Sequence, residues 1–310
     1  MPKVSVIVPN YNHAPYLKQR IESILNQSYQ NFEVLLLDDC STDGSHEVLL
    51  SYKDHPKVTQ VVFNEKNSGS AFLQWSQGIL LAKGEYVWIA ESDDWAEPEL
   101  LTELVRLLDI YPRAGLAYCN SAFFQMDQQY ADSASEKASK FKSDHWAYEY
   151  CVSGKEEIEH ALLWDCTINN VSSVLMRKSV ISSLFPLNRP FVYSGDWYCY
   201  LRIATISDIA YTPKTLNNYR NHACNISKKA GYNYLIELFY IYDWLWSSSF
   251  GIQSKTLVKA FHHCVSDLYA SGLLWKLKRD YRQLFPINRW LYLIMSVKLL
   301  RRKIRRCFIR

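Results

Sequence analysis

Short apolar runs alternate with amphipathic stretches along most of the chain. The runs are rich in Val, Ile and Leu and end at Pro, Asn or Asp, a pattern typical of buried strands. Between them, apolar residues recur at helical spacing, as Leu17, Ile21 and Ile24 do. Strands are predicted over residues 4–8, 32–37, 58–63, 86–90, 116–124, 171–176 and 210–219, and helices from residue 15, from 45, over 70–82, over 97–110 and from 197. This alternation predicts an α/β fold with a doubly wound, mainly parallel sheet.

Two parts of the chain depart from that pattern. Residues 127–144 are polar and rich in Ser and Lys, which predicts a surface excursion or a mobile loop. From residue 232 onward the periodicity is mostly helical. We therefore predict an α/β domain over residues 1–230, followed by a helical C-terminal region over 231–310 that ends in a basic amphipathic tail.

Carboxylates crowd the ends of two predicted strands. Asp38 and Asp39 follow the strand over 32–37, and Asp93 and Asp94 follow the strand over 86–90. In an open α/β sheet both pairs would lie at the same edge, where ligands bind. Crowded carboxylates repel one another unless a cation lies near, and a divalent cation that bridges to a phosphate suits this position. The alternative for the second pair is an acidic loop that caps the next helix, with Pro98 in its first turn.

The glycine-rich phosphate loops of other nucleotide-binding proteins are missing. The chain has neither G-x-G-x-x-G after the first strand nor G-x-x-x-x-G-K-[ST] anywhere. A dinucleotide dehydrogenase or a P-loop enzyme is therefore disfavoured, and phosphate charge would be met by metal. A phosphorylated receiver domain is also disfavoured. In such a domain the Asp pair follows the first strand, whereas here it follows the second, and this chain is too long.

Composition narrows the class further. Hydrophobic residues make up 48% of the chain and aromatic residues 15%, enough for a large core and for rings that stack on sugars. For Trp95, Trp197 and Tyr198, stacking on a sugar and core packing are both open. The eight cysteines contain no C-x-x-C pair and indicate reduced thiols. No signal-peptide pattern and no apolar run of ~20 residues occurs, which predicts a cytoplasmic protein.

Charge is distributed unevenly. Residues 276–310 carry twelve Lys or Arg and one acidic residue, a net charge of +11, so the remainder, with 23 basic and 30 acidic residues, carries −7. An apolar run over 290–297 precedes most of this charge, which predicts that the tail lies on the anionic inner membrane face. Nucleic-acid binding ranks lower, and we predict no nucleic-acid partner. A helix that docks on the body with its Arg face solvated is the remaining alternative.

Several motifs occur together in a recognisable order. They are Val4-Ser-Val-Ile-Val-Pro-Asn-Tyr-Asn12, Leu37-Asp-Asp-Cys-Ser-Thr-Asp-Gly44, Asn67-Ser-Gly69, Ala90-Glu-Ser-Asp-Asp94, Gly195-Asp196 and Tyr219-Arg-Asn-His222. In these motifs the sequence resembles the family-2 glycosyltransferases, which have the GT-A fold, over roughly residues 1–230. The resemblance implies an inverting transfer of sugar from a nucleotide-diphosphate donor, UDP-linked by preference, to a glycan or lipid-linked acceptor in cell-surface polysaccharide synthesis.

The resemblance also assigns roles to individual residues. It implies that Pro9, Tyr11 and Asp39 hold the nucleotide base, with Asp38 beside them. Asp93 and Asp94 resemble the family's Asp-x-Asp element, with Asp93 at the nucleotide and Asp94 on a magnesium or manganese ion. His222 would approach that metal or the diphosphate, although a structural histidine is an equal alternative.

The catalytic base implied by the resemblance is Asp196, which would deprotonate the acceptor hydroxyl. Its alternative is a helix N-terminal charge. Two departures from the family pattern occur here: Gly195 replaces a common Glu, and Gln74-Trp75 replaces an Arg-Asn pair. A non-catalytic sugar-nucleotide-binding scaffold of the same fold is the rival reading, and it would have no need of Asp196.

Overall fold

The computed structural model describes residues 1–222, 232–248, 250–270, 284 and 287–296. Within these residues ten strands form one mixed sheet with the order β3-β2-β1-β4-β9-β6-β10-β5, to which β7 adds beside β6 and β8 beside β10. The strands are β1 (Val4–Asn10), β2 (Phe32–Asp38), β3 (Val58–Phe63), β4 (Tyr86–Ile89), β5 (Trp95–Ala96), β6 (Ala114–Gln125), β7 (Gln128–Asp132), β8 (Tyr150–Val152), β9 (Val174–Arg177) and β10 (Asp208–Arg220).

Parallel pairing aligns the strand ends that carry the acidic residues. β1 is parallel to β2, with Asn10 opposite Asp38, and parallel to β4, with Ile7 opposite Ile89. The carboxyl ends of β2 and β4 therefore flank the end of β1 at one edge, as predicted. β9 is antiparallel to both β4 and β6, so that β4 and β6 run in the same direction, and β10 is parallel to β6. The strands of the central sheet are therefore mostly parallel.

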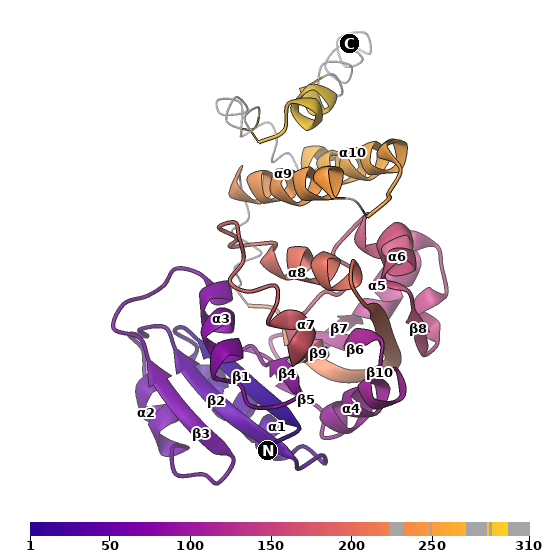
Figure 1. Ribbon diagram of the computed structural model, residues 1–310. Coiled ribbons are helices and arrows are strands. Elements are labelled where there is room, and N and C mark those ends of the chain that lie inside the picture. The colour runs from indigo at the N-terminus through magenta and orange to yellow at the C-terminus, as the bar shows by residue number, and fades with distance from the viewer. Residues whose placement is uncertain (223–231, 249, 271–283, 285–286, 297–310) are drawn as a thin grey trace.

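Helices cover both faces of the sheet, which confirms the predicted doubly wound architecture (Figure 1). Apolar side chains of β1, β2 and β4 point alternately to the two faces and form two separate cores. One core includes α1, α2 and α4, and the other includes α3, α8, α9 and α10. The helices are α1 (Ala14–Leu25), α2 (Ser45–Ser51), α3 (Ala71–Leu81), α4 (Leu100–Ile110), α5 (Ser133–Phe141), α6 (Gly154–Glu157), α7 (Lys178–Ile181), α8 (Gly195–Ala204), α9 (Tyr232–Ser247) and α10 (Ser254–Ala270), with short turns η1 (His145–Ala147), η2 (Ile158–Leu162) and η3 (Val171–Ser173).

Of the two alternatives predicted for residues 127–144, the mobile loop was wrong, because the segment forms a strand and a helix at the surface. β7 pairs antiparallel with β6, and α5 follows, with the Asp132 side chain accepting the Ser135 backbone N–H at 2.9 Å. Ser133 and Lys137 are the buried residues of α5, and the Nζ of Lys137 lies 5.2 Å from the ring centroid of Trp146. Stabilisation here comes from capping and from a cation over aromatic rings, so apolar periodicity gave no signal.

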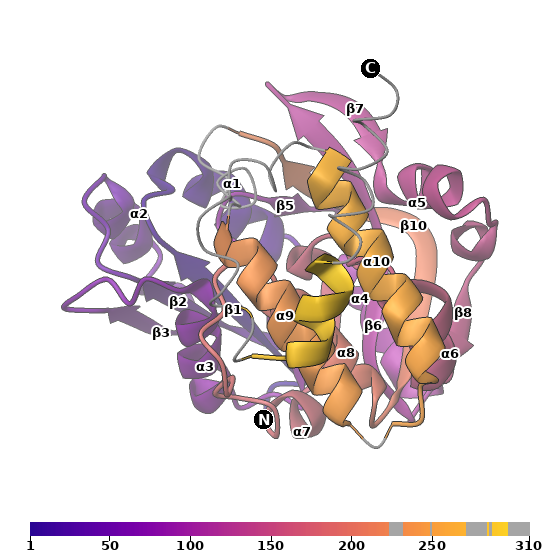
Figure 2. The ribbon, with the colours of Figure 1, turned by 90° about the horizontal axis from the view of Figure 1, so that it is seen from above.

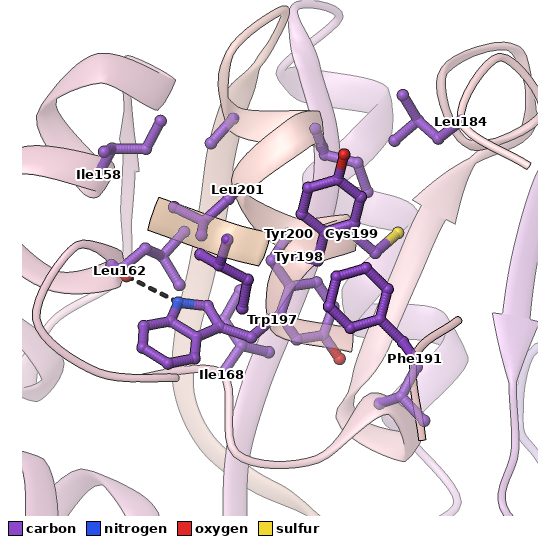
Figure 3. Close-up of a cluster of buried hydrophobic side chains, with 14 of the residues drawn as sticks. Ile158, Leu162, Ile168, Leu184, Phe191, Trp197, Tyr198, Cys199, Tyr200 and Leu201 are labelled. Carbon is purple, nitrogen blue, oxygen red and sulfur yellow. Dashed lines mark hydrogen bonds between the residues drawn. The ribbon is translucent and has the colours of Figure 1, made fainter. Parts of the chain in front are cut away.

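Aromatic and apolar side chains surround α8 (Figure 3). Trp197 and Tyr198 are 2% and 1% exposed. The Trp197 indole N–H donates to the Leu162 carbonyl at 2.7 Å, and Phe191 stacks on Tyr198 with ring centroids 4.8 Å apart. Of the two alternatives for these residues, the structure therefore supports core packing. The same packing fixes the orientation of α8.

The helices after residue 231 belong to the same core as α8. Leu235, Leu238, Phe239 and Phe261, on α9 and α10, are fully buried in it, and α9 lies across α8 when seen from above (Figures 1 and 2). The domain boundary predicted at 230/231 lies outside the described residues.

A part of the C-terminal tail is also helical, over residues 289–296. Leu291 and Met295 are fully buried, whereas Trp290 and Leu293 are 65% and 47% exposed. The Lys and Arg residues that follow the apolar run, from Lys298 onward, lie outside the described residues. Across the described part of the chain, every helix is too short or too polar to cross a membrane.

Candidate active site

The first acidic pair organises the turns after β2. Asp38 is fully buried and accepts hydrogen bonds from Asn10 Nδ2 at 2.7 Å, Ser41 Oγ at 2.6 Å and His46 Nε2 at 2.9 Å. Its carboxylate thus ties the end of β1 to the start of α2. Asp38 was predicted beside the nucleotide base, and in the structure its hydrogen bonds serve the turn.

Asp39 connects three segments at the same edge. Its carboxylate accepts Asn64 Nδ2 at 2.8 Å, the Ser68 backbone N–H at 2.9 Å and Gln74 Nε2 at 3.0 Å. Gln74, which stands where the family has an Arg, is therefore a neutral donor to Asp39, the residue predicted to hold the nucleotide base. Among the other predicted base-binding residues, Pro9 is buried within β1 and Tyr11 is 46% exposed at its end.

Asp94 is held by elements that are distant in sequence. Asn170 Nδ2 and Ser172 Oγ each donate to its Oδ2 at 2.8 Å, and the Arg220 backbone N–H donates to its Oδ1 at 3.1 Å. It is 2% exposed, and burial together with the charge of Asp93 raises the pKa of Asp94. Asp94 therefore joins η3 and β10 to the end of β4.

The histidine predicted to approach the metal lies beside Asp93. His222 Nε2 and Asp93 Oδ2 are 2.8 Å apart, and His13 completes a group in which one ligand atom of each residue lies within 4.8 Å of the others. His13 Nδ1 is 2.8 Å from Ser92 Oγ. A carboxylate and two imidazoles are ligands that suit Mn²⁺ and other first-row metals, so the residues present fit a divalent ion. The structure brings Asp93, not the predicted Asp94, into this group.

A buried arginine lies beneath the acidic residues and was not predicted. Arg20 is fully buried on α1, with its guanidinium carbon 4.9 Å from the Trp88 ring centroid. Burial lowers the pKa of Arg20 to about 10, against the opposing charges of Asp94, Asp93 and Glu91. Its positive charge offsets part of the repulsion among those carboxylates. The available signal was a charged residue within the apolar stripe of α1.

The predicted base, Asp196, lies in the first turn of α8. The Trp197 backbone N–H donates to its Oδ1 at 2.7 Å. Burial raises the pKa of Asp196 to about 6, and the neighbouring carboxylate of Glu237 adds to this rise. A carboxylate with this pKa is ionised at neutral pH and is a stronger base than an exposed one.

Packing explains both departures near this base. A Cβ on Gly195 would lie 2.7 Å from the Phe72 ring and 2.9 Å from Phe191 Cβ, so the family's Glu has no room. The Phe72 ring contacts Trp75 with centroids 4.8 Å apart, and the Trp75 indole N–H donates to Glu91 Oε1 at 2.9 Å. α3 thereby links the start of α8 to the acidic end of β4.

The fold and this site define the class of protein. The structure superposes on S. aureus TarS in complex with UDP-GlcNAc with a TM-score of 0.69 and 18% identity, covering 91% of this chain and 78% of that one. It superposes on the mannosyltransferase PcManGT from Pyrobaculum calidifontis, in complex with GDP-Man and Mn²⁺, with a TM-score of 0.57 and 18% identity, covering 96% and 87%. The fold is therefore that of the GT-A glycosyltransferases.

The family model named Glycosyl transferase family 2 matches residues 5–185, more than half of the chain. The chain therefore belongs to this family. It is 37% identical over 109 residues to the putative teichuronic acid biosynthesis glycosyltransferase TuaG of Bacillus subtilis, covering 35% of this chain and 43% of TuaG. It is 40% identical over 101 residues to glycosyltransferase GlyG of Streptococcus pneumoniae, covering 33% of each. The matched segments thus span less than half of either relative.

The buried charge of Asp196 leads to a stability prediction. Its pKa is about 6 in the folded chain and 3.8 when unperturbed, so the ionised form destabilises the fold above pH 6. This penalty disappears as the pH falls from 6 to below 4, because the folded state then binds the extra proton. We expect Asp196→Asn to raise the free energy of unfolding by about 1–3 kcal/mol at pH 8 and by nothing near pH 4.

Urea unfolding at both pH values measures this difference. Asp54→Asn, at an exposed carboxylate, is the matched control and should leave the free energy of unfolding unchanged. An Asp196→Asn variant that is less stable than wild type at pH 8 would contradict the expected cost of burial.

Proposed function

We propose that the chain transfers a sugar from a UDP-linked donor to an acceptor hydroxyl with inversion, and that Asp196 is the general base. The proposal is carried by one observation: α3 links two groups that have the chemistry of such a site. One is the group of Asp93, His13 and His222, which could hold a metal, and the other is the carboxylate of Asp196, whose pKa is raised. UDP and GDP sugars bound to solved proteins of the same fold support a nucleotide-sugar donor.

Asp93, His222 and His13 would hold a divalent metal, and such an ion would neutralise charge on a diphosphate leaving group. Pro9, Tyr11 and Asp39 would hold the nucleotide base of the donor. This assignment moves the predicted metal ligand from Asp94 to Asp93, since the imidazoles converge on Asp93. The Mn²⁺ bound to PcManGT supports a metal of this kind.

Asp196 would accept the proton of the acceptor hydroxyl as that oxygen bonds to the anomeric carbon. The bond from the same carbon to the diphosphate oxygen breaks, and the electron pair leaves with the nucleoside diphosphate. A single displacement of this kind inverts the centre and needs no covalent sugar–enzyme intermediate. A general base contributes typically ~10²–10⁴-fold to such a step.

The acceptor would be a growing glycan or a lipid-linked sugar of a cell-surface polysaccharide. The name of the Bacillus subtilis relative, which places it in teichuronic acid biosynthesis, supports that destination. The helix over 289–296 supports a membrane role, because it buries Leu291 and Met295 against the body while Trp290 and Leu293 face outward beside Arg289. One face docks on the protein and the other would meet an anionic leaflet.

The test of the transfer chemistry is Asp196→Asn. We expect it to retain UDP binding by calorimetry and to lose at least ~10²-fold in the rate of UDP release from UDP-hexoses with octyl glycoside acceptors. In the wild type kcat/KM should fall below about pH 6, where Asp196 takes up a proton. Normal transfer by the folded variant would contradict the assignment of Asp196 as the base, and wild-type protein that binds UDP without any transfer would favour the non-catalytic scaffold.

The metal assignment separates Asp93 from Asp94. We expect Asp93→Asn and His222→Gln to lose Mn²⁺ binding with little change in melting temperature. Binding is measured from the electron paramagnetic resonance signal of free Mn²⁺. Asp94→Ala should lower the melting temperature instead, because it leaves the buried donors of Asn170, Ser172 and Arg220 without their acceptor. UDP affinity that is equal with and without a chelator would exclude a metal-dependent donor site.

Flotation with liposomes containing phosphatidylglycerol tests the membrane role. The full chain should float at low salt and lose flotation as salt rises, since each cation contributes ~1 kcal/mol near an anionic surface. Trp290→Ser combined with Arg301→Glu and Arg302→Glu should stay at the bottom, while Ile206→Ser, at an exposed apolar residue elsewhere, should float. Wild-type protein that stays at the bottom at low salt would contradict the proposal, and a shift with duplex DNA would favour the nucleic-acid alternative.

A further inference from the structure

A carboxylate on α9 binds the backbone that leads into α8. Glu237 Oε1 accepts the Val192 N–H at 2.8 Å, and Oε2 accepts the Tyr193 and Ser194 N–H groups at 3.0 and 2.7 Å. Glu237 is 3% exposed and Ser194 is 3% exposed. Three successive N–H groups that point at one anion form a concave binding site, here filled by a side chain of the same protein.

The same face of α9 contacts this loop at two further points. Arg189 lies with its guanidinium carbon 4.8 Å from the Tyr240 ring centroid, and its Nη2 is 3.5 Å from Asp243 Oδ2. On the opposite side, Ser70 Oγ at the start of α3 donates to the Phe191 carbonyl at 3.1 Å. The loop over 189–194 is therefore held between α3 and α9, and α8 begins at its end.

We propose that Glu237 is a positioning residue for Asp196: its carboxylate fixes the backbone of residues 192–194 and thereby the first turn of α8. This inference rests on the proposed function, in which Asp196 is the base. Loss of the carboxylate would leave three backbone donors without their acceptor, and a buried donor left unsatisfied is costly. The loop would then shift, and a misplacement of about 1 Å at a reacting group can reduce the rate ~10²-fold.

The charge of Glu237 supplies a second effect on the base. The titratable groups that face Asp196 are Cys166 after η2, Cys199 and Tyr200 on α8, and Tyr234 and Glu237 on α9. Burial raises the pKa of each of these thiols and phenols, which keeps them neutral at pH 7. Glu237 is the carboxylate of this set, and its negative charge favours a proton on Asp196.

The experiment compares Glu237→Gln, Glu237→Asp and Tyr242→Phe in the full chain. Gln keeps the size of the side chain but replaces one acceptor with a donor, whereas Asp keeps the charge. Tyr242→Phe is the matched control on α9, because it removes the hydroxyl that donates to the Leu163 carbonyl at 2.6 Å and does not touch the loop. UDP release from UDP-hexoses with octyl glycosides, UDP affinity, melting temperature and amide hydrogen exchange are measured for each.

We expect Glu237→Gln to lower kcat about tenfold or more at unchanged UDP affinity, and to move the acid limb of the kcat/KM profile to lower pH. Glu237→Asp should recover part of kcat and return the acid limb toward that of the wild type. The amides of Val192, Tyr193 and Ser194 should exchange faster in Glu237→Gln and stay protected in Tyr242→Phe. Tyr242→Phe should lower the melting temperature without changing kcat.

Two results would overturn the inference: Glu237→Gln with wild-type protection of these amides, or a kcat within twofold of wild type. An equal loss of kcat in Tyr242→Phe would reduce Glu237 to a general stabilising role and would equally overturn it. Asp196→Asn in the same series separates this failure from that of the proposed function. If Asp196→Asn transfers normally, both proposals fail; if it is inactive while Glu237→Gln is active, only the positioning role fails.

Discussion

Negative charge gathers where the parallel strands end, and much of the surrounding structure serves to hold it there. Four Asp residues lie at this edge and three of them are almost wholly removed from water, which would be unfavourable without compensation. The compensation comes from backbone amides, Asn and Ser donors and the buried Arg20 beneath them. The polar turns after β2 and β4 are therefore structural supports for a charged site.

The four carboxylates differ because their donors differ. Asp38 and Asp94 each accept hydrogen bonds from segments that they join, and so act as connectors within the fold. Asp39 does the same while lying next to Gln74 of α3. Asp93 instead lies in a group with His222 and His13, in which one ligand atom of each residue lies within 4.8 Å of the others. Similar residues at one sheet edge thus carry different chemistry.

The core that includes α3, α8 and α9 connects this edge to Asp196. Phe72 of α3 occupies the space beside Gly195, and Trp75 of the same helix bonds to Glu91 at the end of β4. On the other side, Glu237 of α9 accepts a hydrogen bond from the Ser194 backbone N–H, directly before α8. Since α3, α8 and α9 share one packed core, a shift of any of them would move Asp196 relative to Asp93.

The longer strands other than β7, most helices, the shared acidic edge and the family were determined by the sequence, because periodicity and short motifs depend on neighbouring residues. Only the tertiary structure decided that His222 pairs with Asp93, 129 positions away, and that His13, Arg20 and Glu237 join the site. A single charged residue has no period, and its role depends on which distant segment lies opposite. The same reason hid α5, whose Lys137 is buried against rings contributed by β6, η1 and β10. Strand order and helix packing, which no local pattern encodes, brought these partners together.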